Sequence, residues 1–205
     1  SLLVGAAVDS GRIQSIDAAV TDYVPELLKN DPRYARLTLR MLLDMRSGIA
    51  FADHDLPWGD KPRAYYDPNL RNVVLSRPLA GDPGAAFQYN SYNPILLGIV
   101  LERTTGMNNA AWLERTLWAR LGMAYPASWS LDSEGSGMEK MESGINARAI
   151  DFAKIGRLML TRGVWGGERV ISASWIDDSM RIDADDRVAQ YGSHLHYRHA
   201  WWITA

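Results

Sequence analysis

The chain has 205 residues, of which 47% are hydrophobic and 22% charged, a composition typical of a folded globular domain. Its 22 basic and 24 acidic residues leave a formal net charge of −2 and form no basic stripe, which argues against a nucleic-acid groove. The absence of cysteine excludes disulfides, thiolate metal sites and a cysteine nucleophile, and no apolar run is long enough to span a bilayer.

Both ends of the sequence resemble the interior of a longer protein. Ser1–Gly11 is predicted to be the second half of a buried helix, closed by Gly11 near its C-cap, and it has neither an initiator methionine nor an N-cap. Tyr197–Thr204 is predicted to be a strand with no later segment to pair with. We therefore expect residues 1–205 to be a single incomplete domain, and its compartment, bacterial periplasm or cytoplasm, stays open.

Two helices and a long loop are predicted before residue 80. A compact helix covers Thr38–Met45, begins at a threonine cap and stops at Ser47-Gly48. Residues 50–69 show no steady period and are predicted to form a long loop, of the kind that often walls a binding cleft. A second helix is predicted for residues 67–76, where an Asp-Pro pair starts it.

The stretch Gly81–Glu102 combines a turn, a polar cluster and a buried helix. Tyr89–Asn93 places five hydrogen-bonding side chains at the start of the helix, where polar groups need partners or a function. Asn93 followed by Pro94 is a common helix start, which predicts Asn93 as N-cap and Pro94 as the first helical residue. That cap does not require Tyr89, so we hypothesise that Tyr89 is a catalytic base or proton relay.

Three further helices are predicted in the second half, over Asn108–Leu121, Ala147–Arg162 and Ser172–Met180. The core face of the first is predicted to hold Trp112, Leu113, Leu117 and Leu121. The inward face of the second is predicted to hold Ile150, Phe152, Ile155, Leu158 and Met159. Residues 124–146 are expected to be irregular, and residues 165–168 to form a hairpin-like turn.

Two patterns were considered for metal binding. His194 and His196 share one strand face while His199 points the other way, so the three form no site without a bend. No carboxylate lies at ligand spacing, and solvated strand histidines are favoured. Asp53-His54-Asp55 fits a metal or acid–base site, but such a triplet is common by chance. No metal or cofactor is predicted.

Other catalytic motifs are missing from the sequence. It contains no G-x-S-x-G elbow, no phosphate-binding loop and no dinucleotide fingerprint. A phenol titrates near pH ~10, so Tyr89 needs a neighbouring cation to act as a base at neutral pH. None of the lysines at positions 29, 61, 140 and 154 follows a serine with the Ser-x-x-Lys spacing. We expect the cation and the nucleophile to lie outside these residues.

Four stretches resemble, in order and spacing, the serine β-lactamase and penicillin-binding-protein superfamily. Phe87–Gly98 (F-Q-Y-N-S-Y-N-P-I-L-L-G) resembles its second motif, and Leu2–Ile13 resembles the helix after the catalytic Ser-x-x-Lys. Leu39–Ile49 resembles the "LL-x-H-x-SG" segment, and Glu142–Leu160 resembles the "GG-x-x-x-TARDLARFG" helix. The similarity covers nearly the whole chain and is closest to the class C-like branch, which includes esterases and 6-aminohexanoate-oligomer hydrolases.

The resemblance implies an α/β (α+β) β-lactamase/transpeptidase-like fold, of which this piece is the mainly helical part with few strands. It also implies hydrolysis of an amide or ester through an acyl-serine, with Tyr89 beside a lysine as general base and later acid. By this resemblance the Ser-x-x-Lys motif lies just upstream of Ser1, and the third motif lies beyond Ala205. The 205-residue piece is therefore expected to be inactive.

One departure from the family pattern bears on the substrate. The second motif is Tyr-Asn-Ser where β-lactamases prefer Tyr-x-Asn, so Ser91 replaces the amide that holds a β-lactam side chain. That favours an amidase or esterase, with Ser91, Ser143 and Gly144 as substrate-binding candidates and a small-molecule amide or ester as partner. Two alternatives stay open: a non-catalytic ligand-binding module on the same fold, and a penicillin-binding peptidase acting on peptidoglycan.

Overall fold

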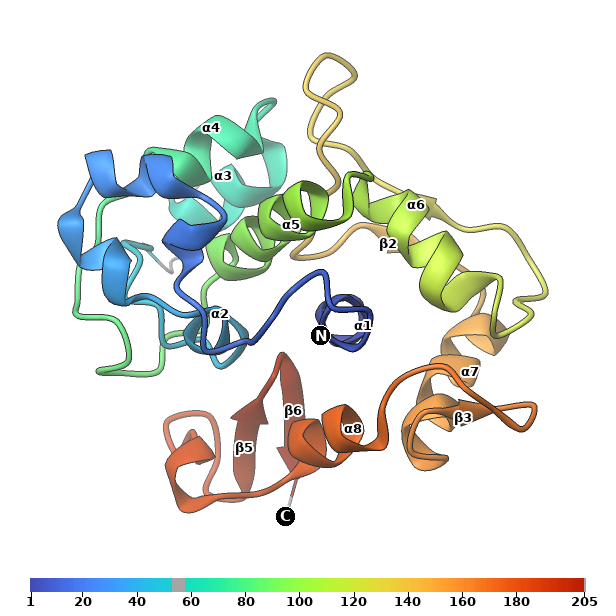
Figure 1. Ribbon diagram of the computed structural model, residues 1–205. Coiled ribbons are helices and arrows are strands. Elements are labelled where there is room, and N and C mark those ends of the chain that lie inside the picture. Colours follow the sequence, from blue (N-terminus) through green and yellow to red (C-terminus); the bar gives the residue numbers. More distant parts are fainter. Residues whose placement is uncertain (53–57, 205) are drawn as a thin grey trace.

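The computed structural model describes residues 1–52 and 58–204 and is a helical body with three short strand pairs (Figure 1). The α-helices are α1 (Leu2–Asp9), α2 (Leu39–Leu43), α3 (Asp60–Tyr66), α4 (Leu70–Leu75), α5 (Tyr92–Thr105), α6 (Asn109–Leu113), α7 (Ala149–Leu160) and α8 (Ala173–Met180). Short helical turns are η1 (Val20–Asp22), η2 (Pro25–Lys29), η3 (Pro32–Arg36), the π-turn η4 (Glu114–Trp118) and η5 (Ala184–Asp186). The strands are β1 (Ser128–Trp129), β2 (Ile145–Asn146), β3 (Val164–Trp165), β4 (Glu168–Arg169), β5 (Leu195–Arg198) and β6 (Trp201–Thr204). Each pair is antiparallel, and the mainly helical character matches the prediction.

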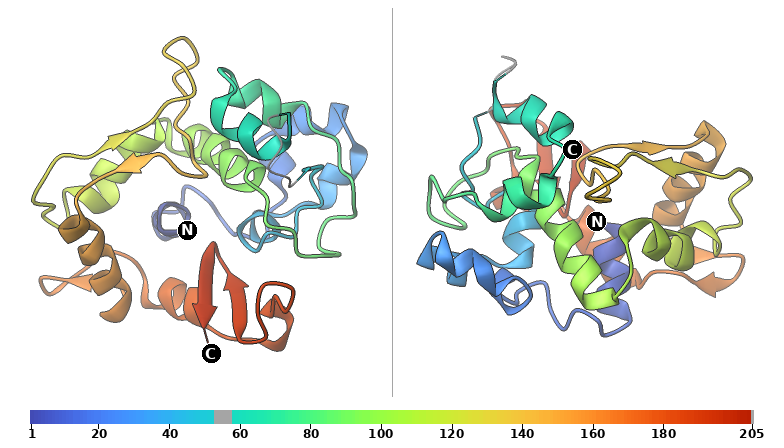
Figure 2. Two further views of the ribbon diagram at one scale, coloured as in Figure 1. Left: turned by 180° about the vertical axis from the view of Figure 1, so that it is seen from behind. Right: turned by 90° about the horizontal axis from the view of Figure 1, so that it is seen from above.

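The core is built around α1 and α5. Figures 1 and 2 both show α1 between α5 and the β5–β6 hairpin. Residues 2–7 of α1 and 95–101 of α5 are buried, because both runs are apolar on every face. As predicted, α1 ends next to Gly11, which adopts a left-handed φ of 71°. Trp112 ties α6 to this centre by donating its indole N–H to the Leu3 carbonyl at 3.1 Å.

The start of α5 differs from the prediction. The helix begins at Tyr92 with Ser91 at the N-cap, so Asn93 is not the cap and Pro94 is the third helical residue. Proline is tolerated there because the first N–H groups of a helix have no partner within it. Asn90 makes the local turn instead: its Oδ1 accepts the Tyr92 N–H at 2.9 Å.

The side chain of Asn93 is buried and joins α5 to the turn after α2. Its Oδ1 accepts a hydrogen bond from the Ser47 hydroxyl at 2.7 Å. Gly48, which follows Ser47, has a φ of 71°, and a Cβ atom there would lie 2.4 Å from the Gly81 carbonyl oxygen. Glycine is therefore required where these two turns meet. The predicted Thr38 cap of α2 is confirmed, since its hydroxyl accepts the Met41 N–H at 3.2 Å.

The prediction of an uninterrupted loop over residues 50–69 is wrong, because α3 lies inside it. This helix is held by polar contacts to α5 and to the segment after α4. Tyr92 donates its hydroxyl to Asp60 at 2.8 Å, and Arg77 pairs with Asp60 and donates to the Tyr92 hydroxyl. Such contacts leave no periodic signal in the sequence. Asp53-His54-Asp55 lies outside the described residues.

The inward face of α7 was also predicted incorrectly. Leu158 is buried as expected, but Ile150 and Phe152 are 56% and 43% exposed. Asp151 occupies the buried side of this first turn, where its carboxylate accepts the N–H groups of residues 124 and 125 at 2.7 and 3.1 Å. These hydrogen bonds to the preceding loop fix which side of α7 faces the core. Ile150 and Phe152, the apolar neighbours of Asp151, therefore face outward.

The prediction of a single strand over residues 197–204 is wrong, because these residues contain the end of β5, a turn and all of β6, which together form most of a hairpin. His199 and Ala200 form its two-residue turn, both with positive φ (45° and 63°), and β5 pairs with β6. The turn docks on the end of α2: Asp44 accepts the His199 N–H at 2.8 Å, and the Leu43 carbonyl accepts the Ala200 N–H at 2.9 Å. Neither residue is one that typically signals this turn type, which explains why the sequence pattern missed it.

Of the three clustered histidines only His194 is exposed; His196 and His199 are buried, so the prediction of solvated histidines is wrong for them. The His199 ring stacks on Trp175 with centroids 5.2 Å apart. Burial lowers the pKa of His199 to about 4, although the Asp178 carboxylate 3.7 Å away opposes the shift. His199 is therefore neutral at physiological pH and acts as part of the core.

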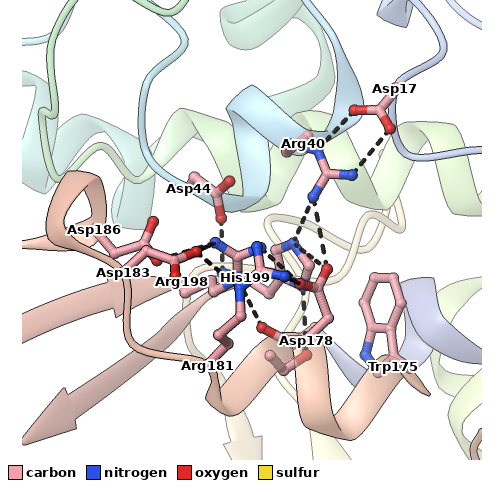
Figure 3. Close-up of polar contacts among 12 residues, drawn as sticks. Asp17, Arg40, Asp44, Trp175, Asp178, Arg181, Asp183, Asp186, Arg198 and His199 are labelled. Carbon is pink, nitrogen blue, oxygen red and sulfur yellow. Dashed lines mark hydrogen bonds and ion pairs between the residues drawn. The ribbon is translucent and has the colours of Figure 1, made fainter.

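Arg198 anchors the hairpin through a network of carboxylates (Figure 3). Its side chain is only 7% exposed and lies 2.6 Å from Asp178, 2.9 Å from Asp186 and 3.4 Å from Asp183. Arg40 of α2 approaches the same Asp178 at 3.7 Å. The network thus connects β5 with α8, η5 and α2, and several carboxylates share one buried cation.

Replacing Arg198 by methionine should destabilise the protein strongly, because it leaves several clustered carboxylates without their buried cation. We expect the free energy of unfolding to fall by about 3 kcal/mol in urea titrations. Arg162→Met removes an exposed pair with Asp177 and should cost only about 0–1 kcal/mol. Equal losses in the two variants would contradict the anchoring role of Arg198.

Candidate active site

Tyr89 lies at the start of α5, on the wall of a cleft. Its ring is 40% exposed and packs edge-on against Tyr197, with centroids 5.9 Å apart, and obliquely on Trp202 at 5.5 Å. Within residues 1–52 and 58–204 its hydroxyl has no hydrogen-bond partner. The two hairpin side chains therefore hold the ring while the phenol oxygen stays available to a ligand.

The cleft contains a cavity of about 350 Å³, which we call the inner cavity. Ser1, Met45, Tyr89, Glu142 and Trp201 lie on its wall, together with apolar side chains of α1, α5 and α7. Trp201 donates its indole N–H to the Ser1 hydroxyl at 3.0 Å, which joins the hairpin to the start of α1. A mostly apolar cavity of this size with a few polar groups is typical of a small-molecule site.

Tyr197 also lines the inner cavity but is a poor candidate for proton transfer. It is 4% exposed, and burial, helped by Tyr89 and Asp44 nearby, raises its pKa well above the usual range. Its phenol stays protonated at all physiological pH values. Of the two phenols on this wall, Tyr89 is the more exposed one, so a ligand in the cavity reaches its hydroxyl more readily.

The backbone before Tyr89 is held by Met45, a non-glycine residue with a φ of 56°. Its carbonyl accepts the Gln88 N–H at 2.8 Å, and its sulfur lies 3.5 Å from the Asn90 N–H. A left-handed conformation of this kind costs on the order of 1 kcal/mol and persists only where the surroundings impose it. Here the strained residue fixes the two neighbours of Tyr89.

A second cavity of about 530 Å³, the outer cavity, adjoins the same segment. It is lined by Lys61, Pro62, Tyr65, Tyr66, Ser91, Glu142 and Ser143. Two of the predicted substrate-binding residues, Ser91 and Ser143, therefore share one wall, and Tyr89 lies in the neighbouring cavity. Glu142 belongs to both walls and links the two spaces.

Gly144 is not on either wall and shapes the turn behind it. Its φ is 91°, and a Cβ atom there would lie 3.2 Å from Lys140 Cβ and 3.3 Å from the Trp129 ring. The Trp129 indole N–H lies 3.0 Å from the Lys140 carbonyl and equally close to the Ser143 carbonyl. The glycine and the indole together present Glu142 and Ser143 to the cavities.

Glu142 is the site residue that the sequence reasoning missed. Both of its carboxyl oxygens are buried and have no hydrogen bond of good geometry from the described part of the chain, although the Ser143 hydroxyl and the Glu142 backbone N–H lie near them. Burial raises its pKa to about 7, although Lys140 and Ser143 favour the charged form. Gly98 makes this approach possible, because a Cβ atom there would lie 2.5 Å from the Met141 side chain. The only signal was its place as the first residue of the motif-like Glu142–Leu160 segment.

A cavity of about 650 Å³ lies elsewhere, between the end of α1, η4 and β4. Arginines 12, 115, 120 and 169 line it, and it contains none of the predicted site residues. The inner and outer cavities, which hold Tyr89, Ser91 and Ser143, therefore form the candidate active site.

The described residues contain no group of three potential metal ligands, and none of their helices has the length and apolar character needed to cross a membrane.

The raised pKa of Glu142 predicts a pH-dependent stability difference. The folded state keeps a proton that the unfolded state releases between pH ~4.5 and ~7, so the stability contribution of Glu142 falls as pH rises through this window. Glu142→Gln should match the wild type at pH 4 and be more stable by about 1–3 kcal/mol at pH 8. Thermal and urea unfolding across this range measures the difference, and a pH-independent difference would argue against a buried carboxyl with a raised pKa.

The amino-acid sequence is similar to that of a known hydrolase. The chain is 32% identical over 219 residues to a 6-aminohexanoate-dimer hydrolase of Paenarthrobacter ureafaciens, an alignment that covers 98% of the chain and 54% of that protein. The chain thus spans about half the length of this curated relative.

Solved structures show the same fold. A Bacillus anthracis protein, provisionally assigned as a 6-aminohexanoate-dimer hydrolase, superposes with a TM-score of 0.82 at 23% identity, covering 98% of this chain and 56% of that one. A penicillin-binding protein homologue from Pyrococcus abyssi superposes with a TM-score of 0.72 at 19% identity, covering 98% and 50%. These likenesses confirm the predicted β-lactamase/transpeptidase-like fold. The family model described as beta-lactamase matches residues 1–191. The chain therefore belongs to the beta-lactamase family.

Proposed function

We propose that the protein containing this chain hydrolyses an amide or ester of a small molecule through an acyl-serine intermediate, with Tyr89 as the proton-transfer residue. The observation that carries the proposal is the unpartnered Tyr89 hydroxyl on the wall of a mostly apolar inner cavity. Tyr89 also occupies the position of the tyrosine in the family's second motif. A phenol that is held in place but free of internal hydrogen bonds suits proton exchange with a bound substrate.

In this proposal a serine–lysine pair supplies the nucleophile and the cation. The serine oxygen attacks the substrate carbonyl as its proton passes to the Lys–Tyr89 pair, and the tetrahedral intermediate then collapses. Tyr89 returns the proton to the leaving amine or alcohol, which departs and leaves the acyl group on the serine. A water molecule then attacks the acyl-serine and releases the carboxylic acid product.

The residues around Tyr89 favour an amidase or esterase over an antibiotic-hydrolysing enzyme. Ser91 stands where β-lactamases carry an amide, and it shares the outer cavity with Ser143 and two tyrosines. A hydroxyl offers one donor where an amide offers a carbonyl acceptor and an NH₂ donor group, so it holds the side chain of a β-lactam less firmly. The Paenarthrobacter relative is named a 6-aminohexanoate-dimer hydrolase, not a β-lactamase, which supports the same choice.

Tyr89→Phe in the intact protein should lower kcat for p-nitrophenyl ester hydrolysis by roughly 10²-fold or more, because the phenol oxygen that relays the proton is removed. The ring is retained and partly exposed, so the melting temperature should stay close to that of the wild type. Tyr191→Phe is the matched control: Tyr191 packs on the same Trp202 ring at 5.4 Å but lies outside both cavities. It should keep wild-type turnover.

Three outcomes decide against the proposal. Full activity of Tyr89→Phe would remove Tyr89 from the chemistry, and a complete lack of ester and amide turnover by the intact protein would favour a non-catalytic binding module. Stable labelling by fluorescent penicillin without ester turnover would favour a penicillin-binding peptidase. Because no serine in the 205 residues precedes a lysine with Ser-x-x-Lys spacing, this chain alone should not turn over p-nitrophenyl esters.

A further inference from the structure

Four arginines line the cavity of about 650 Å³ that lies away from the candidate active site, and we call this space the arginine cavity. Arg12 follows α1, Arg115 belongs to η4, Arg120 follows η4, and Arg169 lies on β4, so segments far apart in the sequence meet here. Among the described residues, Asp9 is the only acidic side chain on its wall. Four positive charges and one negative charge give this wall a formal net charge of +3, whereas the whole chain carries −2.

Two of the guanidinium groups are held in place by backbone carbonyls. Arg120 donates to the carbonyls of Val170 and Arg169 at 3.2 and 2.7 Å. Arg169 donates to the carbonyls of Arg162 and Ile171 at 2.9 and 3.3 Å. A carbonyl orients a guanidinium group but leaves its positive charge uncompensated. Each group has five N–H donors, so donors of both side chains remain for a ligand.

The other two guanidinium groups make still fewer bonds. One nitrogen of Arg12 donates to the Thr105 carbonyl at 3.2 Å, and the group lies 5.6 Å from the centre of the Trp112 ring. Arg115 makes no hydrogen bond or ion pair within residues 1–52 and 58–204. Most of the donors of both side chains are therefore available to a ligand in the cavity.

No carboxylate neutralises this cluster. Asp9 accepts the Ser172 N–H at 2.7 Å, and in the described ranges no ion pair joins it to the four arginines. By contrast, Arg162, which lies just before the β3–β4 hairpin, pairs with Asp177. A concave site lined by charges of one sign focuses their field and concentrates ions of the opposite sign. The arginine cavity thus attracts anions, although the chain as a whole is slightly acidic.

We propose that the arginine cavity binds a ligand that carries two or more clustered phosphate groups. The inference goes beyond the proposed function, because this cavity contains none of the active-site residues. The planar fork of a guanidinium group matches the oxygens of a phosphate in a bidentate way. A single carboxylate offers only two oxygens, so guanidinium groups from separate segments fit several phosphates better. The volume lies within the range of small-molecule sites.

The first test compares tripolyphosphate, orthophosphate and tricarballylate, a compound with three carboxylates, by calorimetry with the intact protein at neutral pH. We expect tripolyphosphate to bind at least about tenfold more tightly than either of the others, because its phosphates reach several guanidinium groups at once. Its affinity should fall as sodium chloride is added, since salt screens the attraction. Equal binding of the three anions would overturn the proposal.

Single substitutions locate the binding. Arg115→Gln should lower the affinity for tripolyphosphate at least about tenfold, because hydrogen bonds to a charged group are lost. The melting temperature without ligand should stay close to that of the wild type, since the side chain makes no bond in the fold. Arg12→Gln should weaken binding in the same direction and is a second, independent variant.

Arg157→Gln is the matched control for the change of charge. Arg157 lies on α7, outside the cavity, with its guanidinium group 5.0 Å from the centre of the Trp165 ring. This variant should keep the wild-type affinity for tripolyphosphate. Wild-type affinity in both cavity variants, or an equal loss in Arg157→Gln, would mean that the anion responds only to overall charge, and the assignment of the cavity would be wrong.

Clustered phosphates occur in soluble compounds and in lipid headgroups, and a sedimentation experiment separates these sources. The intact protein is mixed with phosphatidylcholine vesicles, with or without phosphatidylinositol bisphosphate. Co-sedimentation that requires this lipid and is lost in Arg115→Gln assigns the site to a headgroup. Binding of tripolyphosphate without such co-sedimentation assigns it to a soluble compound. If neither probe binds the intact protein, the proposal fails.

Discussion

The docking of the β5–β6 turn on the end of α2 is the contact on which the candidate site depends. Asp44 and the Leu43 carbonyl accept the N–H groups of His199 and Ala200, and Arg198 fastens the same turn to α8 and η5. Burial raises the pKa of Asp44 to about 6, so this acceptor also sits in a poorly solvated place. The hairpin would be a marginal structure by itself, since isolated two-stranded ribbons are rarely stable in water.

From this anchor the geometry of the site follows. The fixed hairpin places Tyr197 and Trp202 around the Tyr89 ring, and Trp201 on the hydroxyl of Ser1. Tyr89 is also supported from the core side. Met45, whose backbone has a positive φ, contacts Gln88 and Asn90, the two chain neighbours of Tyr89. Tyr89 is therefore positioned by segments more than 100 residues apart, and its own hydroxyl is spared from internal bonding. A fixed ring with an unbonded hydroxyl suits a residue that must keep its position and exchange a proton.

Much of the fold could be predicted from local pattern, and the failures share one physical cause. The apolar runs of α1 and α5 and the Thr38 cap are local signals and were confirmed. The errors at Asn93, at α3 and on the α7 face arise from tertiary hydrogen bonds, made by Ser47, Tyr92 and Asp151, that override local preference. The same applies to the buried His199. Motif order proposed Tyr89 as a candidate, because the family pattern keeps its neighbours adjacent in sequence, and its catalytic role stays a prediction. Glu142 could not be found this way, since its place between the two cavities depends on tertiary structure.

The central claim is that Tyr89 faces the reacting carbonyl of a substrate bound in the inner cavity. A crystal structure of the intact protein inactivated by an alkyl fluorophosphonate tests it most directly. The account predicts a phosphonylated serine with an oxygen within about 3 Å of the Tyr89 hydroxyl. An adduct remote from Tyr89 would contradict it.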